Sequence, residues 1–260
     1  MSDAKWDDLR LRLLSGLVLA GVGVAGVIIG GVWFQMLTVF VTAIMVWELW
    51  MMVAPDAPVP GMLLAAGVAS ILSGLFADPL ILAFAIAPPL LGALALKRER
   101  VTFACFALAI IIAGWGLVTF RETYGMVWIL WLIVVVVVTD VGGYFAGRFI
   151  GGPKFWPAIS PKKTWSGTIA GWLGAAAIGA LFWAMTPAGA DLIWISALVS
   201  FASQMGDIAE SALKRRMKVK DSSTLIPGHG GLFDRFDGLL GASLLMLLTA
   251  QFVDVPTVSI

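Results

Sequence analysis

Residues 124–146 read YGMVWILWLIVVVVVTDVGGYFA, an apolar stretch that carries a single charged residue, Asp140. The hydrocarbon core of a bilayer is about 30 Å thick, and a helix needs about 20 mainly apolar residues to cross it. The whole chain has this character, because 60% of its residues are hydrophobic, 13% are charged and the mean hydropathy is +0.97. Soluble domains carry far more charge. The sequence therefore predicts an all-α, polytopic integral membrane protein.

Nine stretches meet this length requirement, so we expect about nine transmembrane helices. They are 11–30, 32–54, 60–77, 79–96, 101–120, 124–146, 166–187, 191–214 and 238–254. The fourth contains Pro88 and Pro89, which should kink it because each proline removes a helix hydrogen bond. No soluble domain is apparent, so residues 1–260 are expected to form one membrane-embedded domain.

Basic residues gather on one side of this arrangement. With the N-terminus in the cytoplasm, the connections at 97–100, 148–163 and 214–235 lie on the cytoplasmic side. These connections and the N-terminal end hold all of the 17 lysines and arginines except Arg121. Cytoplasmic loops are enriched in these residues. The pattern therefore predicts a cytoplasmic N-terminus and a C-terminus on the outer side.

The segment 211–237, SALKRRMKVKDSSTLIPGHGGLFDRFD, concentrates the polar chemistry of the chain. It holds six of the 17 basic residues, three of the 16 carboxylates and the only histidine, His229. The cations suit phosphate, the carboxylates suit a divalent cation such as magnesium, and the glycines allow backbone amides to approach a ligand. A basic run after an apolar helix is also a topology signal and a lipid-headgroup contact. That reading leaves the carboxylates, glycines and histidine unexplained, so we expect a site for a polyphosphate with its metal.

A carboxylate at membrane depth is costly and by default paired or functional, and Asp140, Asp207 and Glu48 stand out within expected spans. Asp140 shares a helical face with Tyr144 and Arg148, whereas Asp207 lies on a polar stripe that runs into the segment 211–237. At 1.5 Å per residue, Asp207 should lie roughly 10 Å deeper than Lys214, a depth that suits a lipid phosphate. Structural pairing between helices is the alternative for both aspartates. For Glu48, interfacial anchoring by the neighbouring tryptophans is the favoured account.

The connection at 147–165 is the second candidate site segment. Lys162, Lys163 and Thr164 directly precede the expected seventh helix. Such residues bind phosphate with the help of a helix N-terminus. They serve equally well as a helix cap and a cytoplasmic anchor, and their spacing does not separate the two functions.

A family resemblance rests on these same segments. The pattern Ser211-x-Leu213-Lys214-Arg215, Lys220-Asp221 and Pro227-x-His229-Gly230-Gly231-Leu232-x-Asp234-Arg235-Phe236-Asp237 resembles the signature of the phosphatidate cytidylyltransferases, also called CDP-diacylglycerol synthases. Ser160-Pro161-Lys162-Lys163-Thr164, and Asp140 followed by Tyr144 and Gly147-Arg148, are similar to other shared elements of that family. Ser166 departs from the pattern, which has Glu there. The resemblance implies a membrane enzyme that joins CTP and phosphatidic acid, giving CDP-diacylglycerol and pyrophosphate with one or two magnesium ions.

The resemblance also implies roles for individual residues. Asp207 and Asp234 are the implied metal ligands, with Asp221 and Asp237 as further candidates. The implied catalytic residues are Asp207, Asp234, Asp221 and Lys220. The residues expected to bind substrate are Lys214, Arg215, Arg235, His229, Ser211, Lys162, Lys163, Thr164, Asp140 and Tyr144. A phosphate monoester is already ionised near neutral pH and needs no strong base, so His229 is assigned to binding or positioning.

The expected partners are CTP, phosphatidic acid and membrane lipids, with no nucleic acid, and a homodimer is compatible with the sequence. The expected location is a bacterial-type inner membrane with the active site facing the cytoplasm, which supplies CTP.

Two other functions are weighed beside this one. Asp234-x-x-Asp237-Gly238 resembles the opening of the CDP-alcohol phosphotransferase motif, but Gly241-Ala242-Ser243 stands where that motif continues differently. A transporter would use Asp140 and Asp207 along an ion path and should carry polar groups across to the outer side. Polar residues here crowd the cytoplasmic side, which favours an enzyme.

Overall fold

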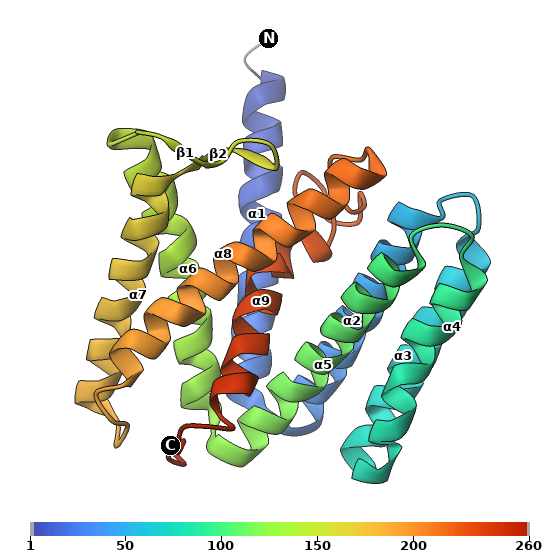
Figure 1. The fold of residues 1–260 in the computed structure, drawn as a ribbon, viewed down its shortest axis with the longest axis horizontal. Helices are drawn as coiled ribbons and strands as arrows, with labels where there is room; N and C mark the ends of the chain where they lie inside the picture. The colour runs from blue at the N-terminus through green and yellow to red at the C-terminus, as the bar shows by residue number, and fades with distance from the viewer. Residues whose placement is uncertain (1–2, 259–260) are drawn as a thin grey trace. The chain divides into compact units, whose positions relative to one another are not determined.

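The computed structural model describes residues 3–258, with side chains from residue 14 onward except at positions 77, 79 and 82. These residues form helices, the loops that join them and one small hairpin (Figure 1). The helices are α1 (Asp3–Ile29), α2 (Gly31–Val53), α3 (Pro58–Ala77), η1 (Pro79–Ile86), α4 (Ala87–Ala95), α5 (Arg100–Tyr124), α6 (Met126–Phe149), α7 (Trp165–Met185), α8 (Leu192–Met217) and α9 (Phe233–Thr249). The predicted all-α class is confirmed.

Six helices in the described part of the chain are long and apolar enough to cross a membrane. They are α2, α3 over Pro58–Phe76, α5, α6, α7 and α8. The other three expected spans coincide with shorter apolar helices at Leu14–Ile29 and Ala83–Ala95 and with the 17-residue α9. The structure thus supports a polytopic membrane protein, while the count of nine spans and their orientation stay predictions. The side chains of Lys5, Arg10 and Arg12, which contribute to the expected orientation, lie outside those described.

The fourth expected span is two short helices in place of one kinked helix. The 3₁₀ helix η1 runs to Ile86, and α4 begins at Ala87. Pro88 and Pro89 therefore occupy the first turn of α4, where a backbone N–H has no helical acceptor and its absence costs little. The prolines thus start a helix and do not bend the middle of one.

The connection after α6 contains a two-stranded antiparallel sheet that was not predicted from the sequence. Strands β1 (Lys154–Trp156) and β2 (Ser160–Thr164) pair, and Figure 1 shows them at one end of α6 and α7. The hydroxyl of Thr164 accepts a hydrogen bond from the amide of Gly167 at 3.2 Å and caps α7. The hairpin therefore holds Lys162 and Lys163 immediately before the start of α7.

The chain divides into two compact units. The first consists of Met1–Val118 with Met217–Arg235, and the second of Thr119–Arg216 with Phe236–Ile260. Such a division does not test whether the chain acts as one catalytic domain over residues 1–260, so that expectation stays a prediction.

Aromatic residues and glycines build the core of the first unit. Trp50 is 2% exposed and meets Phe103 edge to face, with ring centroids 5.6 Å apart. Its indole N–H donates to the carbonyl of Ala57 at 2.7 Å. Trp50 is therefore a buried packing residue, which contradicts the interfacial anchoring expected for it.

In the second unit, close helix contacts depend on glycine. A Cβ on Gly167 would lie 2.5 Å from the carbonyl oxygen of Gly143, and one on Gly147 would lie 2.9 Å from the hydroxyl of Thr164. This confirms that Gly143 and Gly147 let helices approach closely. Where α8 and α9 meet, a Cβ on Gly206 would collide with the carbonyl of Asp237.

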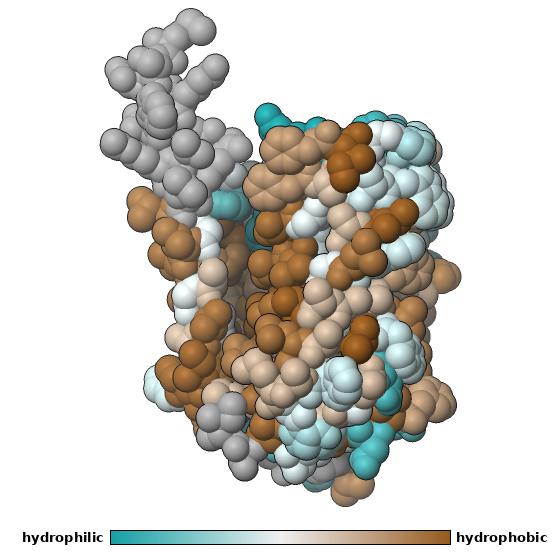
Figure 2. All heavy atoms as spheres, turned by 90° about the vertical axis from the view of Figure 1, so that its left-hand side faces the viewer, coloured by the Kyte–Doolittle hydropathy of each residue, from teal (hydrophilic) through white to brown (hydrophobic). Residues whose placement is uncertain are grey.

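The outward face of α7 is apolar. Its exposed side chains include Ile169, Leu173, Leu181, Trp183 and Met185. Figure 2, which views the side of the molecule that carries α7, shows mainly hydrophobic residues with hydrophilic ones gathered towards the top and bottom. This distribution suits a face that contacts lipid tails between two headgroup layers.

Candidate active site

A polar cavity of about 410 Å³ lies in the second unit. Small-molecule sites typically measure roughly 300–1,000 Å³. The residues that line it come from α6, β2, α7 and α8, and those predicted from the sequence are Asp140, Tyr144, Lys162, Lys163, Thr164 and Asp207. The fold thus brings together one cluster of predicted site residues from three separate stretches of sequence.

Helix α6 lines the cavity with the predicted face. Asp140, Tyr144 and Arg148 all lie on it, within the last ten residues of the helix. The guanidinium of Arg148 donates to the Tyr144 hydroxyl at 2.7 Å and lies 6.0 Å from the centre of its ring. The side chain of Arg148 is thereby held on the face that lines the cavity.

An ion pair joins the hairpin to α8 across the cavity. The Lys163 ammonium lies 2.6 Å from Oδ2 of Asp207 and donates to the carbonyl of Gln204 at 3.3 Å. The hydroxyl of Ser211 donates to Oδ1 of Asp207 at 3.3 Å. Both carboxylate oxygens of Asp207 therefore have partners, and one partner is a cation expected to bind phosphate.

The stripe predicted on α8 has a partly structural role. Gln204 accepts a hydrogen bond from the indole of Trp172 at 3.0 Å and donates to the carbonyl of Thr168 at 3.3 Å, which ties α8 to α7. Lys214 forms an ion pair with Glu210, whose side chain is fully buried. Arg215, the next predicted cation, is exposed.

Asp237 is the fifth residue of α9 and lies just before the expected span 238–254. Burial, together with the nearby negative charge of Asp207, raises the pKa of Asp237 from 3.8 to about 7. The charges of Asp207 and Asp237 thus interact unfavourably, and a bound cation would relieve that repulsion.

The signature loop, residues 217–232 in the first unit, is closed by Asp234. Its Oδ2 accepts three hydrogen bonds at 2.8 Å, from the amide and the hydroxyl of Ser222 and from the amide of Gly231. A Cβ on Gly230 would lie 2.7 Å from the same oxygen and 3.3 Å from the Cβ of Asp221, so the two aspartates are neighbours. Asp234 therefore has a loop-ordering role besides the metal-binding role that the resemblance implies.

The remaining predicted residues of the first unit differ in exposure. His229 is partly buried, and its Nδ1 lies 2.8 Å from the hydroxyl of Ser15 in α1. Lys220, Asp221 and Arg235 are exposed. The contact of His229 with Ser15 is compatible with a positioning role. The three exposed side chains are accessible to a soluble ligand.

Glu48 has a structural importance that was not expected from the sequence. Its side chain is fully buried in α2, and four hydrogen-bond donors surround its carboxyl group. They are the hydroxyls of Ser222 and Ser223 and the amides of Leu232 and Phe233. A lone carboxylate in an apolar span was the available signal, but its partners lie more than 170 residues away in sequence.

No group of three histidine, cysteine, aspartate or glutamate side chains among the described residues is placed to hold a metal ion. Magnesium is commonly bound by one or two carboxylates together with substrate phosphates and water. Asp207 and Asp237, with their mutually unfavourable charges, fit a cation site that a phosphate substrate completes. They do not fit a site formed by protein ligands alone.

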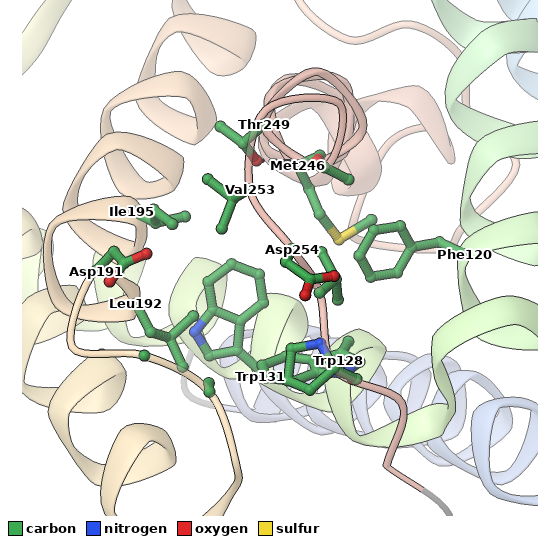
Figure 3. A pocket seen from close by; sticks show the side chains of 15 residues that line it. Phe120, Trp128, Trp131, Asp191, Leu192, Ile195, Met246, Thr249, Val253 and Asp254 are labelled. Carbon is green, nitrogen blue, oxygen red and sulfur yellow. Dashed lines mark hydrogen bonds between the residues drawn. The ribbon is translucent and has the colours of Figure 1, made fainter.

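Two other cavities contain none of the residues predicted from the sequence to form the site. One of about 520 Å³ in the first unit is lined by the α2–α3 turn and by Lys97 and Arg98. Another, of about 60 Å³, lies beside the N-terminal end of α6, where mainly aromatic and aliphatic side chains surround it together with Asp191 and Asp254 (Figure 3). In its wall, Trp131 donates to Ser196 at 3.0 Å and Trp128 to the carbonyl of Pro256 at 2.8 Å.

The fold and the polar cavity define an all-α membrane protein with a phosphate-compatible site near one end of its helices. The sequence profile of the cytidylyltransferase family matches residues 10–253. The chain belongs to this family, which confirms the resemblance.

Similarity to individual proteins supports the assignment. The chain is 31% identical to a phosphatidate cytidylyltransferase of Bacillus subtilis over 264 residues, covering 90% of this chain and 94% of that protein. It is 45% identical to one of Brucella suis over 139 residues, covering 53% of this chain and 52% of that protein. It is 38% identical to one of Helicobacter pylori over 136 residues, covering 52% and 51%. The match thus spans about half the length of the Brucella and Helicobacter relatives.

Proposed function

We propose that the protein is a phosphatidate cytidylyltransferase, which transfers CMP from CTP to phosphatidic acid and forms CDP-diacylglycerol and pyrophosphate in phospholipid biosynthesis. The observation that carries this proposal is the cavity that Lys162, Lys163 and Arg148 line together with Asp207, whose carboxylate pairs with Lys163. Cations beside a carboxylate suit a polyphosphate with its metal. Membership of the cytidylyltransferase family supports the same chemistry.

The reaction is a nucleotidyl transfer. A phosphate oxygen of phosphatidic acid attacks the α-phosphorus of CTP and forms a new P–O bond. The bond from that phosphorus to the oxygen bridging the α- and β-phosphates breaks, and pyrophosphate leaves with the electron pair. Because the attacking phosphate is already ionised, the protein needs to position both substrates and to neutralise charge. Lys162, Lys163 and Arg148 would stabilise the negative charge that accumulates on the phosphates.

A magnesium ion would be held by Asp207 and Asp237, with Asp234 and Asp221 remaining candidates for a second. When bound, it would supply charge neutralisation at the reacting phosphates. The Lys163 ammonium lies 2.6 Å from Asp207 and competes for the same oxygen. We therefore expect Lys163 to turn from Asp207 towards a substrate phosphate when the cation binds.

The position of the cavity suits a lipid substrate. It lies beside the last ten residues of α6 and the first residues of α7, and the positive-inside rule assigns these ends to the cytoplasmic surface. Phosphatidic acid would enter from the inner leaflet and CTP from the cytoplasm. The inner membrane, a cytoplasmic active site and a C-terminus on the outer side belong to this proposal.

The proposal is tested by pyrophosphate release from detergent-purified protein given CTP, phosphatidic acid and magnesium. Release should require all three components. In Asp207→Asn it should fall by about 100-fold or more, the scale on which one charge-stabilising group contributes. Asp191→Asn, a change in the same unit beside the small cavity of Figure 3, is the matched control and should retain activity.

Other results would overturn the proposal. Absence of release from folded wild-type protein, across several lipids and metals, would favour a CDP-alcohol phosphotransferase or a transporter. Equal activity of Asp207→Asn and wild type would exclude Asp207 from the site.

A further inference from the structure

Glu48 and the signature loop form one hydrogen-bonded assembly within the first unit. Oε1 of Glu48 accepts from the Ser223 hydroxyl at 2.6 Å and the Leu232 amide at 2.9 Å. Oε2 accepts from the Phe233 amide at 2.7 Å and the Ser222 hydroxyl at 3.2 Å. All four partners are donors, a set that only a group able to accept at both oxygens can satisfy.

Two of these donors mark the start of α9. The amides of Leu232 and Phe233 belong to the N-terminal end of this helix, where backbone N–H groups lack helical acceptors. Negative charge at a helix N-terminus is favourable because of the helix dipole. Glu48 thus caps α9 from another helix, at a distance of more than 180 residues along the chain.

Of the other two donors, Ser222 connects Glu48 to Asp234. The Ser222 hydroxyl lies 3.2 Å from Glu48 and 2.8 Å from Asp234, and the Ser222 amide also donates to Asp234. Gly231 fits between these groups, because a Cβ there would collide with the Ser222 hydroxyl and with Glu48. Glu48 therefore lies beneath the loop that carries Lys220, Asp221 and His229.

A buried carboxyl group is costly unless its partners compensate for lost water. Glu48 is fully buried in a membrane helix, and its neighbour Trp50 is buried as well. Leucine or methionine would pack in α2 without this cost. The observed glutamate serves the loop, since none of its four partners belongs to α2.

We propose that Glu48 is a positioning residue, which fixes the signature loop and the start of α9 in the arrangement needed for phosphate and metal binding. This inference rests on the proposed function, because the loop's role in the reaction is part of that proposal. Glu48 itself touches neither substrate nor metal in this account and acts through Ser222, Ser223 and the backbone of residues 232–233.

The test compares full-length wild type with Glu48→Gln. Glutamine has the same size, but its NH₂ group is a donor and meets donors in this site. Hydrogen exchange at the Leu232 and Phe233 amides should accelerate by at least about tenfold, as expected when hydrogen bonds to a charged acceptor are lost. The catalytic efficiency kcat/KM for CTP should fall by about 10- to 100-fold because reacting groups are misplaced.

Thr38→Val is the matched control. Thr38 is a buried polar residue of the same helix, and its hydroxyl donates only within α2, to Phe34 at 2.8 Å. It should change neither exchange at residues 232–233 nor kcat/KM. Glu48→Asp keeps the negative charge on a side chain one methylene shorter, so this variant should fold. It should recover part of the activity, and part of the protection from hydrogen exchange, that Glu48→Gln loses.

The outcomes separate this inference from the proposed function. The positioning role would be overturned if the Leu232 and Phe233 amides exchanged at wild-type rates in Glu48→Asp and, where that variant folds, in Glu48→Gln. This holds even if pyrophosphate release is observed. Faster exchange without any transferase activity in wild type would leave the capping contact in place and overturn its assignment to this reaction. Accelerated exchange with unchanged kcat/KM would make Glu48 purely structural.

Discussion

At the scale of single residues, three carboxylates in apolar helices are held by specific partners. Asp207 pairs with Lys163, Glu210 with Lys214, and Glu48 with donors from the signature loop. Glu48 and Glu210 are fully buried, and removing a partner of a buried charge leaves it uncompensated, which costs more than the interaction contributes. Substitutions at these sites therefore need a fold measurement beside each activity measurement.

Asp237→Asn tests which carboxylates hold magnesium. We expect the magnesium concentration for half-maximal activity to rise by at least about tenfold. Metal affinity falls by about that much even when only a group that hydrogen-bonds a metal ligand is removed. Magnesium titration of pyrophosphate release measures it. Asp234→Asn is the comparison, because Asp234 has three loop hydrogen bonds. An unchanged magnesium requirement in Asp237→Asn would contradict the assignment of the cation to Asp207 and Asp237.

Sequence patterns predicted which residues share a helical face, but they did not predict which residues from different helices contact each other. Asp140 and Tyr144 were placed on one face by helical spacing, and the structure confirms that both line the cavity. The ion pair of Lys163 with Asp207 and the partners of Glu48 could not be predicted, because they join segments far apart in sequence. Helical periodicity describes neighbours within one helix and carries no information on which helices meet.

At the scale of elements, glycine contacts determine how closely α6 and α7 pack. Gly143 faces Gly167, and their backbones approach so closely that no side chain fits between them. Their packing holds the last turns of α6 beside Thr164 and the hairpin, and so shapes the cavity. Small residues serve this purpose in membrane proteins, where lipid tails provide no hydrophobic drive for helix association.

Gly167→Ala should destabilise this packing. A Cβ would lie 2.5 Å from the carbonyl oxygen of Gly143, so the helices must shift, at a cost of about 1–3 kcal/mol for overpacking. Thermal unfolding in detergent measures the loss. Gly142→Ala is the control, because its nearest neighbour, the carbonyl oxygen of Ala170, would be 3.9 Å away and alanine favours helix. Equal unfolding temperatures for the two variants would refute the close contact.

Helices were easier to predict than the irregular elements between them. Each of the nine expected spans coincides with helical structure, because long apolar runs are a strong signal. The hairpin of β1 and β2 was missed, since its three- and five-residue strands are short and lie in a stretch dominated by Pro, Gly and Lys. The 3₁₀ helix η1 was missed because Pro88 was assumed to lie within a continuing helix.

At the scale of the whole molecule, apolar helices and a polar cavity suit the proposed reaction between a lipid and a soluble nucleotide. The membrane character and the signature were both readable from the sequence, and family membership confirms the latter. The division into two compact units was not readable, because it depends on which helices contact each other. Phosphatidic acid would reach the cavity without leaving the bilayer, and only CTP would have to arrive from water.

The most direct test of the central claim follows the α-phosphorus of CTP. Purified protein in lipid nanodiscs that contain phosphatidic acid receives magnesium and CTP labelled at the α- or the γ-phosphate. We predict that the α-label enters the lipid fraction as CDP-diacylglycerol and that the γ-label leaves as pyrophosphate. Retention of the α-label in water-soluble compounds, with wild-type protein that remains folded, would contradict the account.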